Sequence, residues 1–468
     1  MFKDSKIIGT LLVTFIAIII GLLKPFSGLG PQGHLILASV IVALGLWIFK
    51  PGGVPFMAGS AFLVGSGLLF GLKYTTVVSG FVNSALWILI PALYFGFALQ
   101  KTGLGKRVAY LVLKSFKPSW ASIALSWFII GVILSALTPS TTVRVAIIMP
   151  IALGVIDACK LEYRSKGSAY IAIVAFAMCL IPGCGWLTGS LSGPIFLGLT
   201  PPDLKHLVNF NSWFQILFVP WFIVTIVFAI LAYFFMAPKE KIGITNDTFK
   251  QQYAQLGAIS RPEIITMVVL IVTLILFATE RVHGIPAAST ALLALAILLL
   301  TGIIKAPEIG VGANWDIIVF FGVTISLVTI FSEAKIAAWI NPILQPSLSA
   351  LAPSPLLFML VITFGIFLIR FIDVPWGLST VALTSTLLVP MFNNFGIHPL
   401  VIMFAFLAGV NFFLLSYQQP WMLMAEGIIS NKGWDSNHVL IGGLCYIAAV
   451  VITLLVCIPY WQMIGVIH

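Results

Sequence analysis

Charged residues are scarce in this chain. Asp, Glu, Lys and Arg together make up 8% of its 468 residues, whereas about 25% is usual for a soluble globular protein. Hydrophobic residues make up 60%, and the mean hydropathy is +1.13. This composition indicates a polytopic helical membrane protein. Unbroken apolar runs such as 7–23, 83–99 and 284–303 argue against an outer-membrane barrel, whose strands alternate over about 10 residues.

Motifs for metal binding, redox chemistry and catalysis are also missing. The five cysteines lie mostly in apolar stretches without CxxC spacing, and none of the six histidines pairs with another at metal-ligand spacing. No Walker loop, dinucleotide fingerprint or Ser-His-Asp arrangement stands out. We therefore expect neither an enzyme nor an ATP-driven pump, and no cofactor other than Na⁺ as a coupling ion.

The surplus of basic residues has an explanation in membrane topology. The formal net charge is +10, from 24 Lys and Arg against 14 Asp and Glu. Successive apolar segments put most of these cations on the cytoplasmic side, so the surplus is an orientation signal with some attraction to anionic lipid, and no nucleic-acid surface. Lys24 follows the first apolar run without a small-residue cleavage site, so we expect a retained first helix and a cytoplasmic N-terminus.

Residues 119–157 form an apolar segment that is interrupted at its middle by the polar run from Thr138 to Arg144. Lysine and arginine flank the segment on both sides, so the positive-inside rule puts both flanks in the cytoplasm. The segment must cross twice or dip in and return, and Pro139 cannot donate to a helical ladder. We interpret it as a re-entrant hairpin whose tip, at bilayer depth, is a candidate binding site.

A second copy of this pattern follows in the other half of the chain. Asn83 and Asn314 each precede a helix, an amphipathic stretch and a broken apolar segment, which in the second half spans about 354–395. Each predicted hairpin has a Ser-Thr pair at its tip and then a proline, Pro150 or Pro390. The later counterparts are an apolar segment interrupted at 182–194 or 416–420 and a closing helix at 212–237 or about 437–462.

The two copies face opposite ways across the membrane. Residues 333–353 hold Lys335 as their one basic residue, while the matching stretch of the first half is rich in Lys and Arg, so the second hairpin enters from outside. The fold class that follows is an all-α polytopic membrane protein with about eleven transmembrane helices in two inverted repeats, each with a re-entrant hairpin and a broken helix. The loop 238–262 joins the halves in the cytoplasm, and the C-terminus lies outside.

Two hairpin tips and two helix breaks near the midplane offer free backbone groups where water is scarce. Half-helix N-termini attract anions, whereas carbonyls and hydroxyls suit a small hard cation. Arg144 is a bidentate fork for a carboxylate or sulfate, a structural ion-pair partner, or a side chain that snorkels along its half-helix. Arg370 and Asp373 are three residues apart, which favours mutual neutralisation, and Glu426 is expected at the membrane interface.

The candidate ligands lie at the tips and the breaks. Candidate substrate ligands are Ser140, Thr141, Thr142, Arg144, Thr188, Gly189, Ser379, Thr380 and Gln418. Candidate sodium ligands are Ser140, Thr142, Gly189, Ser190, Ser379 and Thr380. The alternative for Thr188 and Ser190 is a hydrogen bond back to a helix carbonyl, and Tyr417 and Gln419 beside the second break carry a similar choice between binding and structure.

The run Thr138-Pro-Ser-Thr-Thr-Val-Arg144 resembles the Thr-Pro-Ser-Asn-Thr-Ala-Arg motif of the divalent anion/sodium symporter family, in its branch of di- and tricarboxylate antiporters. Trp186-Leu-Thr-Gly189 resembles the Phe-Leu-Thr-Gly of the same group, and residues 101–107 resemble its cytoplasmic arm. The resemblance covers nearly the whole chain. Thr141 stands where the family has asparagine, and the second tip has Ser379-Thr380-Val381 in place of Ser-Asn-Thr.

The resemblance implies a homodimer that works as an elevator, in which a transport domain moves against a fixed scaffold. The division is 1–118 for scaffold helices and the first arm, 119–210 for the first half of the transport domain, 211–353 for the closing helix, linker, further scaffold helices and second arm, 354–436 for the second half of the transport domain, and 437–468 for the last helix. In the family, substrate and sodium bind at the hairpin tips and helix breaks.

We therefore expect a secondary active transporter of small anions in the plasma (bacterial inner) membrane. Its cargo would be di- or tricarboxylates or related divalent anions, moved by sodium symport or by anion exchange. Alternatives are a sulfate-type anion carrier, a cation/proton antiporter-like relative, and a channel or non-transporting scaffold. A cation exchanger would need an acidic residue at the tips, where only Asp373 is available.

Overall fold

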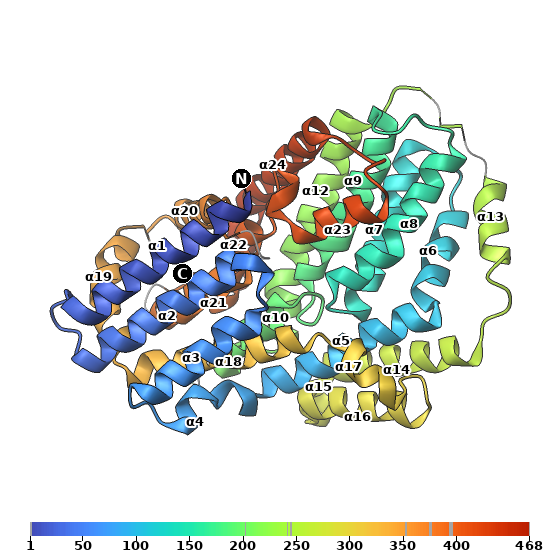
Figure 1. Cartoon of the computed structure of the whole chain (residues 1–468). Coiled ribbons are helices and arrows are strands. Elements are labelled where there is room, and N and C mark those ends of the chain that lie inside the picture. The colour runs from blue at the N-terminus through green and yellow to red at the C-terminus, as the bar shows by residue number, and fades with distance from the viewer. Residues whose placement is uncertain are drawn as a thin grey trace.

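The structure is helical throughout the residues that it describes. This computed structural model describes residues 2–201, 203–240, 242–243, 246–351, 353–373, 377–392 and 396–467, with the backbone alone for residues 2–5, 378 and 389–392. Within these ranges there is no strand, and one isolated antiparallel bridge joins Ile397 to Ile467. Ten of the described helices are long and apolar enough to cross a membrane. The predicted all-α membrane class is confirmed (Figure 1).

Five helices precede the first amphipathic arm. They are α1 (Phe2–Leu23), α2 (Pro31–Phe49), α3 (Phe56–Leu69), the short α4 (Tyr74–Val77) and α5 (Ser84–Thr102). Figure 1 shows α1, α2 and α3 side by side, in blue. The helix predicted at 54–72 is shorter than expected at both ends, and after its last turn Gly71 adopts a φ of +87°, a left-handed conformation that ends helices.

The same order of elements occurs twice. The first repeat runs through α5, the arm α6 (Leu104–Lys114), the hairpin helices α7 (Trp120–Leu137) and α8 (Thr141–Ala158), α9 (Lys166–Leu180), a 3-10 turn (Ile181–Gly185), α10 (Ser192–Leu199), α11 (Phe210–Trp213), a π turn (Phe214–Phe218) and α12 (Val219–Met236). The second runs through α18 (Trp315–Glu333), the arm α19 (Ile336–Leu351), the hairpin helices α20 (Pro355–Ile369) and α21 (Leu378–Phe392), α22 (Pro399–Val410), a 3-10 turn (Ser416–Gln418), α23 (Pro420–Ile428) and α24 (Ser436–Met463). Between the repeats lie α13 (Asn246–Ala254), α14 (Arg261–Ala278), α15 (Glu280–His283), α16 (Ala287–Leu300) and α17 (Ile309–Gly312).

Each predicted span has a helical counterpart, and each predicted break is a break. Residues 374–376 of the second tip, the side chain of Pro390 and the terminal His468 lie outside the described residues. The helix predicted at 284–304 is the shorter α16, followed by Gly302 with a φ of +71°.

The two repeats pack in matched pairs. Helix α8 of the first hairpin contacts α23 of the second broken helix, and α21 of the second hairpin contacts α10 of the first. The closing helices α12 and α24 contact each other, and α7 packs on α9 as α20 packs on α22. This reciprocity is what a two-fold relation between the halves produces. It brings each hairpin against the broken helix of the other repeat.

Each hairpin has an open end opposite its tip, which we call its mouth. The mouths of the two hairpins lie at opposite ends of α24. At the first mouth, Arg164 donates through its backbone N–H to the carbonyl of Lys432 at 3.0 Å and through Nε to that of Asn431 at 2.7 Å, just before α24 begins. At the second, the N–H of His398 donates to the carbonyl of Val466 at 2.9 Å, just after α24 ends. Helix α24 has 28 residues and is therefore about 42 Å long. The hairpins enter from opposite sides, as the charge pattern predicts.

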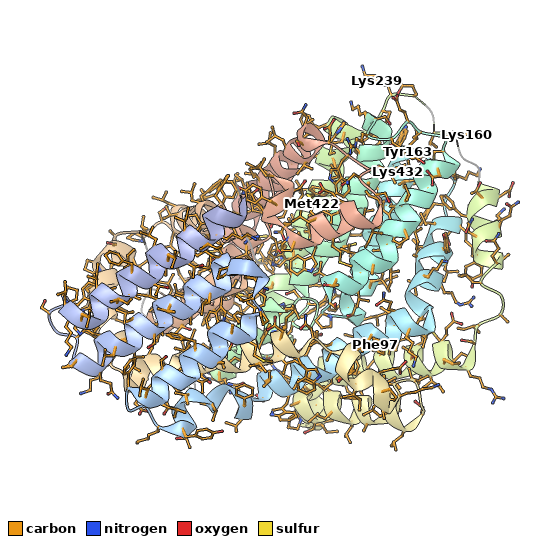
Figure 2. All side chains as sticks on the ribbon, in the orientation of Figure 1. Phe97, Lys160, Tyr163, Lys239, Met422 and Lys432 are labelled. Carbon is orange, nitrogen blue, oxygen red and sulfur yellow. The ribbon has the colours of Figure 1, made fainter. Side chains whose placement is uncertain are left out.

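Basic residues gather at the first mouth. Figure 2 shows Lys160, Lys239, Lys432 and Tyr163 near one another at one edge of the molecule. The ammonium of Lys432 lies 4.5 Å from the centre of the Tyr163 ring. This is the end for which the positive-inside rule predicts the cytoplasm.

A buried ion pair fastens the arm α6 to the start of α14. Arg107 Nε donates to Glu263 Oε1 at 2.6 Å, with the two side chains 8% and 6% exposed. The other guanidinium nitrogens donate to the carbonyls of Leu256, Gly257 and Ala258, which follow α13. One arginine thus joins the first repeat to the linker and to the helices between the repeats.

Glu263→Gln is expected to lower the free energy of unfolding by about 3–5 kcal/mol, because it leaves the buried Arg107 guanidinium without a counter-charge. Unfolding of the purified protein in detergent measures the loss. Asp247→Asn is the matched control, since Asp247 pairs with Lys250 where the side chains are 75% and 60% exposed, and should cost less than about 1 kcal/mol. Equal losses for the two variants would contradict this account.

Candidate functional site

The tip of the first hairpin is an extended turn that starts a new helix. Thr138 ends α7 in extended backbone, and Pro139 has no N–H to continue the ladder. The N–H of Ser140 donates to Thr138 Oγ1 at 3.1 Å, and Ser140 Oγ accepts from the N–H of Val143 at 3.2 Å as the N-cap of α8. The first-turn N–H groups of α8 have no partners within the helix, so the tip carries a partial positive charge.

A cavity of about 400 Å³ lies against this tip. We call it the tip cavity. It is lined by Leu93, Phe97, Gln100, Ser140, Thr141, Thr142, Val143, Leu191, Val311, Gly312, Asn314, Ile317, Pro420, Trp421 and Met424. The hairpin and the two breaks form one side of it, and α5 and the start of α18 form the other. Three predicted substrate ligands, Ser140, Thr141 and Thr142, are brought together here.

No acidic or basic side chain of the described residues lines the tip cavity. Two helix N-termini meet there, those of α8 and α23. Their first-turn residues are joined, since Trp421 Nε1 donates to Thr142 Oγ1 at 3.1 Å. A ligand in this cavity would be held by helix dipoles, hydroxyls and amides, a set of groups that favours an anion.

Arg144 lies behind the tip and is fully buried. Its Nε donates to the carbonyl of Cys179 at 2.7 Å, and its Nη1 donates to those of Thr138 and Gly189 at 2.6 and 2.8 Å. Nη2 donates to Thr141 Oγ1 at 3.0 Å. The Arg144 guanidinium, which we expected to bind a substrate carboxylate, therefore donates to protein oxygens instead. It has no acidic partner among the described residues. The guanidinium fastens the tip to the break between α9 and α10.

Two glycines permit this close contact. A Cβ on Gly189 would lie 2.4 Å from the carbonyl oxygen of Gly183, and a Cβ on Gly183 would lie 2.6 Å from Arg144 Nη2. A side chain at either position would push the break away from the guanidinium. Gly189, a predicted ligand of substrate and sodium, thus offers a carbonyl that Arg144 already occupies.

Thr188 and Ser190 lie apart from the tip cavity. Thr188 is 6% exposed and lines a second, largely aromatic cavity of about 410 Å³ between the first break, α11, the π turn and α14. Ser190 Oγ is buried and has no hydrogen-bond partner among the described residues. Neither hydroxyl bonds back to a helix carbonyl, so that alternative does not hold here.

Arg370 and Asp373 hold the second tip, and both are fully buried. Arg370 donates through Nη1 to the carbonyl of Asp373 and through Nη2 to that of Gln418. The carboxylate of Asp373 accepts from the N–H of Thr380 at 3.2 Å and from its hydroxyl. The sequence predicts that Arg370 and Asp373 neutralise each other. The hydrogen bonds of their side chains go elsewhere, because the arginine links the tip to the second break and the aspartate caps α21. Ser379 Oγ is buried without a partner among the described residues.

The glutamines of the second break shape its backbone. Gln418 Oε1 accepts from the N–H groups of Leu414 and Leu415 at 2.7 and 3.0 Å. Gln419 Nε2 donates to the carbonyls of Val410 and Phe412 at 2.9 and 3.2 Å. These contacts keep both glutamines buried and off the tip cavity, although Pro420 and Trp421 directly after them line it.

Glu426, expected at the membrane interface, is half-buried and bonded. Its Oε1 accepts from Ser416 Oγ at 2.5 Å and from Trp434 Nε1 at 2.8 Å. The two breaks also contact each other, since Asn411 Nδ2 donates to Cys184 Sγ at 2.9 Å. A network of side chains therefore fixes the second break on both sides.

Among the residues that line the tip cavity, three with a polar side-chain group were not predicted as ligands: Gln100, Asn314 and Trp421. Two carried a signal, because Asn314 opens the second copy of the repeat and Trp421 follows the proline of the second break. Gln100 is a single amide near the end of an apolar helix, and no pattern in the sequence distinguishes it.

The predicted sodium ligands are spread over separate places. Ser140 and Thr142 lie at the tip cavity, Gly189 and Ser190 behind it, and Ser379 and Thr380 at the second tip. The carbonyl oxygens around the first tip are ligands that suit sodium, but here they accept hydrogen bonds from the Arg144 guanidinium. Among the described residues, no group of three or more His, Cys, Asp and Glu could hold a metal ion.

Known proteins share the sequence and the fold. The family model described as the sodium:sulfate symporter transmembrane region matches residues 4–467. A putative malate transporter of Bacillus subtilis is 25% identical over 74% of this chain and 73% of its own length. The L-tartrate/succinate antiporter of Escherichia coli is 25% identical over 68% of this chain and 66% of its own length. The Alcanivorax borkumensis YdaH transporter, solved as a crystal structure, covers 93% of this chain and 98% of its own at a TM-score of 0.59 and 14% identity, a likeness of fold alone.

Arg144→Lys is expected to lower the thermal stability of the protein in detergent without any added substrate. A lysine cannot span the three carbonyls, and each buried carbonyl left unpaired costs about 1–3 kcal/mol. Arg164→Lys is the control, because Arg164 is exposed and bonds to the carbonyl of Asn431 alone through its side chain. Unchanged stability together with lost ligand binding would make Arg144 a substrate ligand after all.

Proposed function

Because the chain belongs to the sodium:sulfate symporter family and is a membrane transporter of anions, we propose that it exchanges small dicarboxylates across the membrane. The tip cavity carries the proposal. It is large enough for a small molecule, and it combines two helix N-termini with hydroxyls and amides but no acidic side chain. The relatives named for malate and for tartrate and succinate favour this cargo.

Two buried arginines favour exchange over sodium symport. Arg144 donates to three carbonyls and a hydroxyl at the first tip, and Arg370 donates to two carbonyls at the second. Such oxygens are the ligands that a sodium ion would use. Asp373 offsets the charge of Arg370, and Arg144, which has no acidic partner among the described residues, leaves one permanent positive charge that can partly balance an anion in place of sodium. Thr141 stands where the family has an asparagine, and this difference in the motif also favours exchange over sodium symport.

The proposal includes an elevator mechanism. Residues 119–210 and 354–436 would move as a transport domain against the remainder of the chain, and the position of the tip cavity between hairpin and scaffold elements supports this. The carrier would be a homodimer in the plasma (bacterial inner) membrane. The basic first mouth and the N-terminus would face the cytoplasm, and the C-terminus would lie outside.

Proteoliposomes loaded with unlabelled L-malate are expected to take up external labelled L-malate, whereas liposomes without an internal dicarboxylate take up little, with or without an inward sodium gradient. The same assay with labelled succinate, tartrate, citrate or sulfate outside and the same unlabelled anion inside ranks the cargo. Sodium-driven uptake into unloaded liposomes would contradict exchange. Failure to move any of the five anions would contradict the carrier, and proton or cation exchange in its place would support the antiporter-like alternative through Asp373.

Thr142→Ala is expected to raise the KM for the exchanged dicarboxylate about 10-fold, because it removes one hydroxyl worth about 1.4 kcal/mol from the tip cavity. Counterflow at varied external concentration measures KM. Thr188→Ala is the matched control, because Thr188 lines a different cavity, and it is expected to leave KM unchanged. The reverse ranking of the two threonines would place the substrate in the second cavity.

A further inference from the structure

The wall of the tip cavity that faces the hairpin is chemically simple. It consists of Leu93, Phe97, Gln100, Val311, Gly312, Asn314 and Ile317. Only two of these side chains, those of Gln100 and Asn314, carry groups that can form hydrogen bonds, and both end in a carboxamide. They belong to α5 and to the start of α18, outside the two hairpins.

The two carboxamides have different hydrogen bonds to spare. Asn314 is the N-cap of α18, and its Oδ1 accepts from the N–H of Ile317 at 3.4 Å, which leaves the Nδ2 hydrogens as donors. The side chain of Gln100 has no partner among the described residues, so its Oε1 can accept. Both side chains, those of Gln100 and Asn314, are exposed. The bonds of Lys101 Nζ to the carbonyl of Ile303 at 2.9 Å and to Glu308 Oε2 at 2.5 Å hold this end of α5 against the segment that precedes α18.

The pair of donor and acceptor matches a hydroxyl group. A hydroxyl oxygen accepts one hydrogen bond and its hydrogen donates another, whereas a carboxylate only accepts and a methylene does neither. The opposite wall already supplies what carboxylates need, in the N-termini of α8 and α23. The carboxamides of Gln100 and Asn314 are therefore available to a part of the substrate other than its carboxylates.

We propose that Gln100 and Asn314 recognise the hydroxyl of a hydroxylated four-carbon dicarboxylate, with Asn314 Nδ2 donating to the hydroxyl oxygen and Gln100 Oε1 accepting its hydrogen. The inference rests on the proposed function and names the substrate class within it. The two residues are specificity-determining. They select malate-like anions over succinate, which has the same carboxylates and no hydroxyl.

The test compares KM for L-malate and succinate in counterflow with the full-length protein. Asn314→Ser keeps an N-cap for α18 and removes the amide, and Gln100→Met keeps the length of the side chain without its oxygen. The wild type is expected to prefer malate, and each variant is expected to raise the KM for malate about 10-fold while the KM for succinate stays unchanged.

Asn83→Ser is the matched control. Asn83 caps α5 as Asn314 caps α18, accepting from the N–H of Ala85 at 3.0 Å, but it does not line the tip cavity. The substitution keeps the cap, removes an amide and should leave the ratio of the two KM values unchanged. Asn83 Nδ2 also donates to the carbonyl of Gly198 at 3.2 Å, so the control also loses a bond between α5 and α10. A shift as large as that of Asn314→Ser would mean that the loss of a structural amide away from the tip cavity is enough to cause it, and would overturn the proposal.

The remaining outcomes separate this inference from the proposed function. No exchange of any dicarboxylate by the wild type contradicts the proposed function itself. Exchange by the wild type without a preference for malate overturns the present inference alone. This outcome is measured on the wild type, so it does not depend on whether the variants fold. Equal weakening of malate and succinate by both variants also overturns it, because the amides would then bind a carboxylate that the two substrates share.

Discussion

The backbone of a membrane protein must satisfy its own hydrogen bonds at bilayer depth, and the hairpin tips are where this chain has most difficulty in doing so. A tip leaves carbonyls at the end of one helix and N–H groups at the start of the next. One buried arginine at each tip, Arg144 and Arg370, takes up carbonyls of the tip and of the adjacent break. At the start of α8, which borders the tip cavity, the N–H groups of Ser140 and Val143 donate to hydroxyls of the tip itself. The arginines thus satisfy the carbonyls of the tips, whereas short side chains cap the start of the next helix.

Much of the architecture was predictable from the sequence because the membrane acts on local properties. Apolar length, prolines and the placement of Lys and Arg marked the helices, the tips at Ser140 and Ser379, and the inversion of the second repeat. The mouths at opposite ends of α24 agree with a prediction drawn from the near absence of basic residues in 333–353. These features need no knowledge of which helix touches which.

The direction of individual side chains was not predictable in the same way. Arg144 was as compatible with a substrate carboxylate as with the carbonyls of Cys179 and Gly189, and only the packing of α9 against the hairpin decides between them. Thr188 is next to Gly189 in the chain but faces another cavity, because the break turns between them. Gln100 becomes part of a site only through contacts between helices far apart in sequence. Residue type and spacing fix depth in the membrane, while neighbours fix orientation.

The two buried guanidinium groups also make the hairpin tips sensitive to the membrane voltage. A charge carried across the bilayer exchanges about 2.3 kcal/mol with a potential of 100 mV. Two arginines against the single Asp373 leave the tips with excess positive charge, so in an inside-negative cell an empty transport domain would return outward against the field. A bound anion offsets that charge on the way back. If the chain is an exchanger that moves in this way, the electric field itself would disfavour the outward return of the empty carrier and so favour its return with an anion bound.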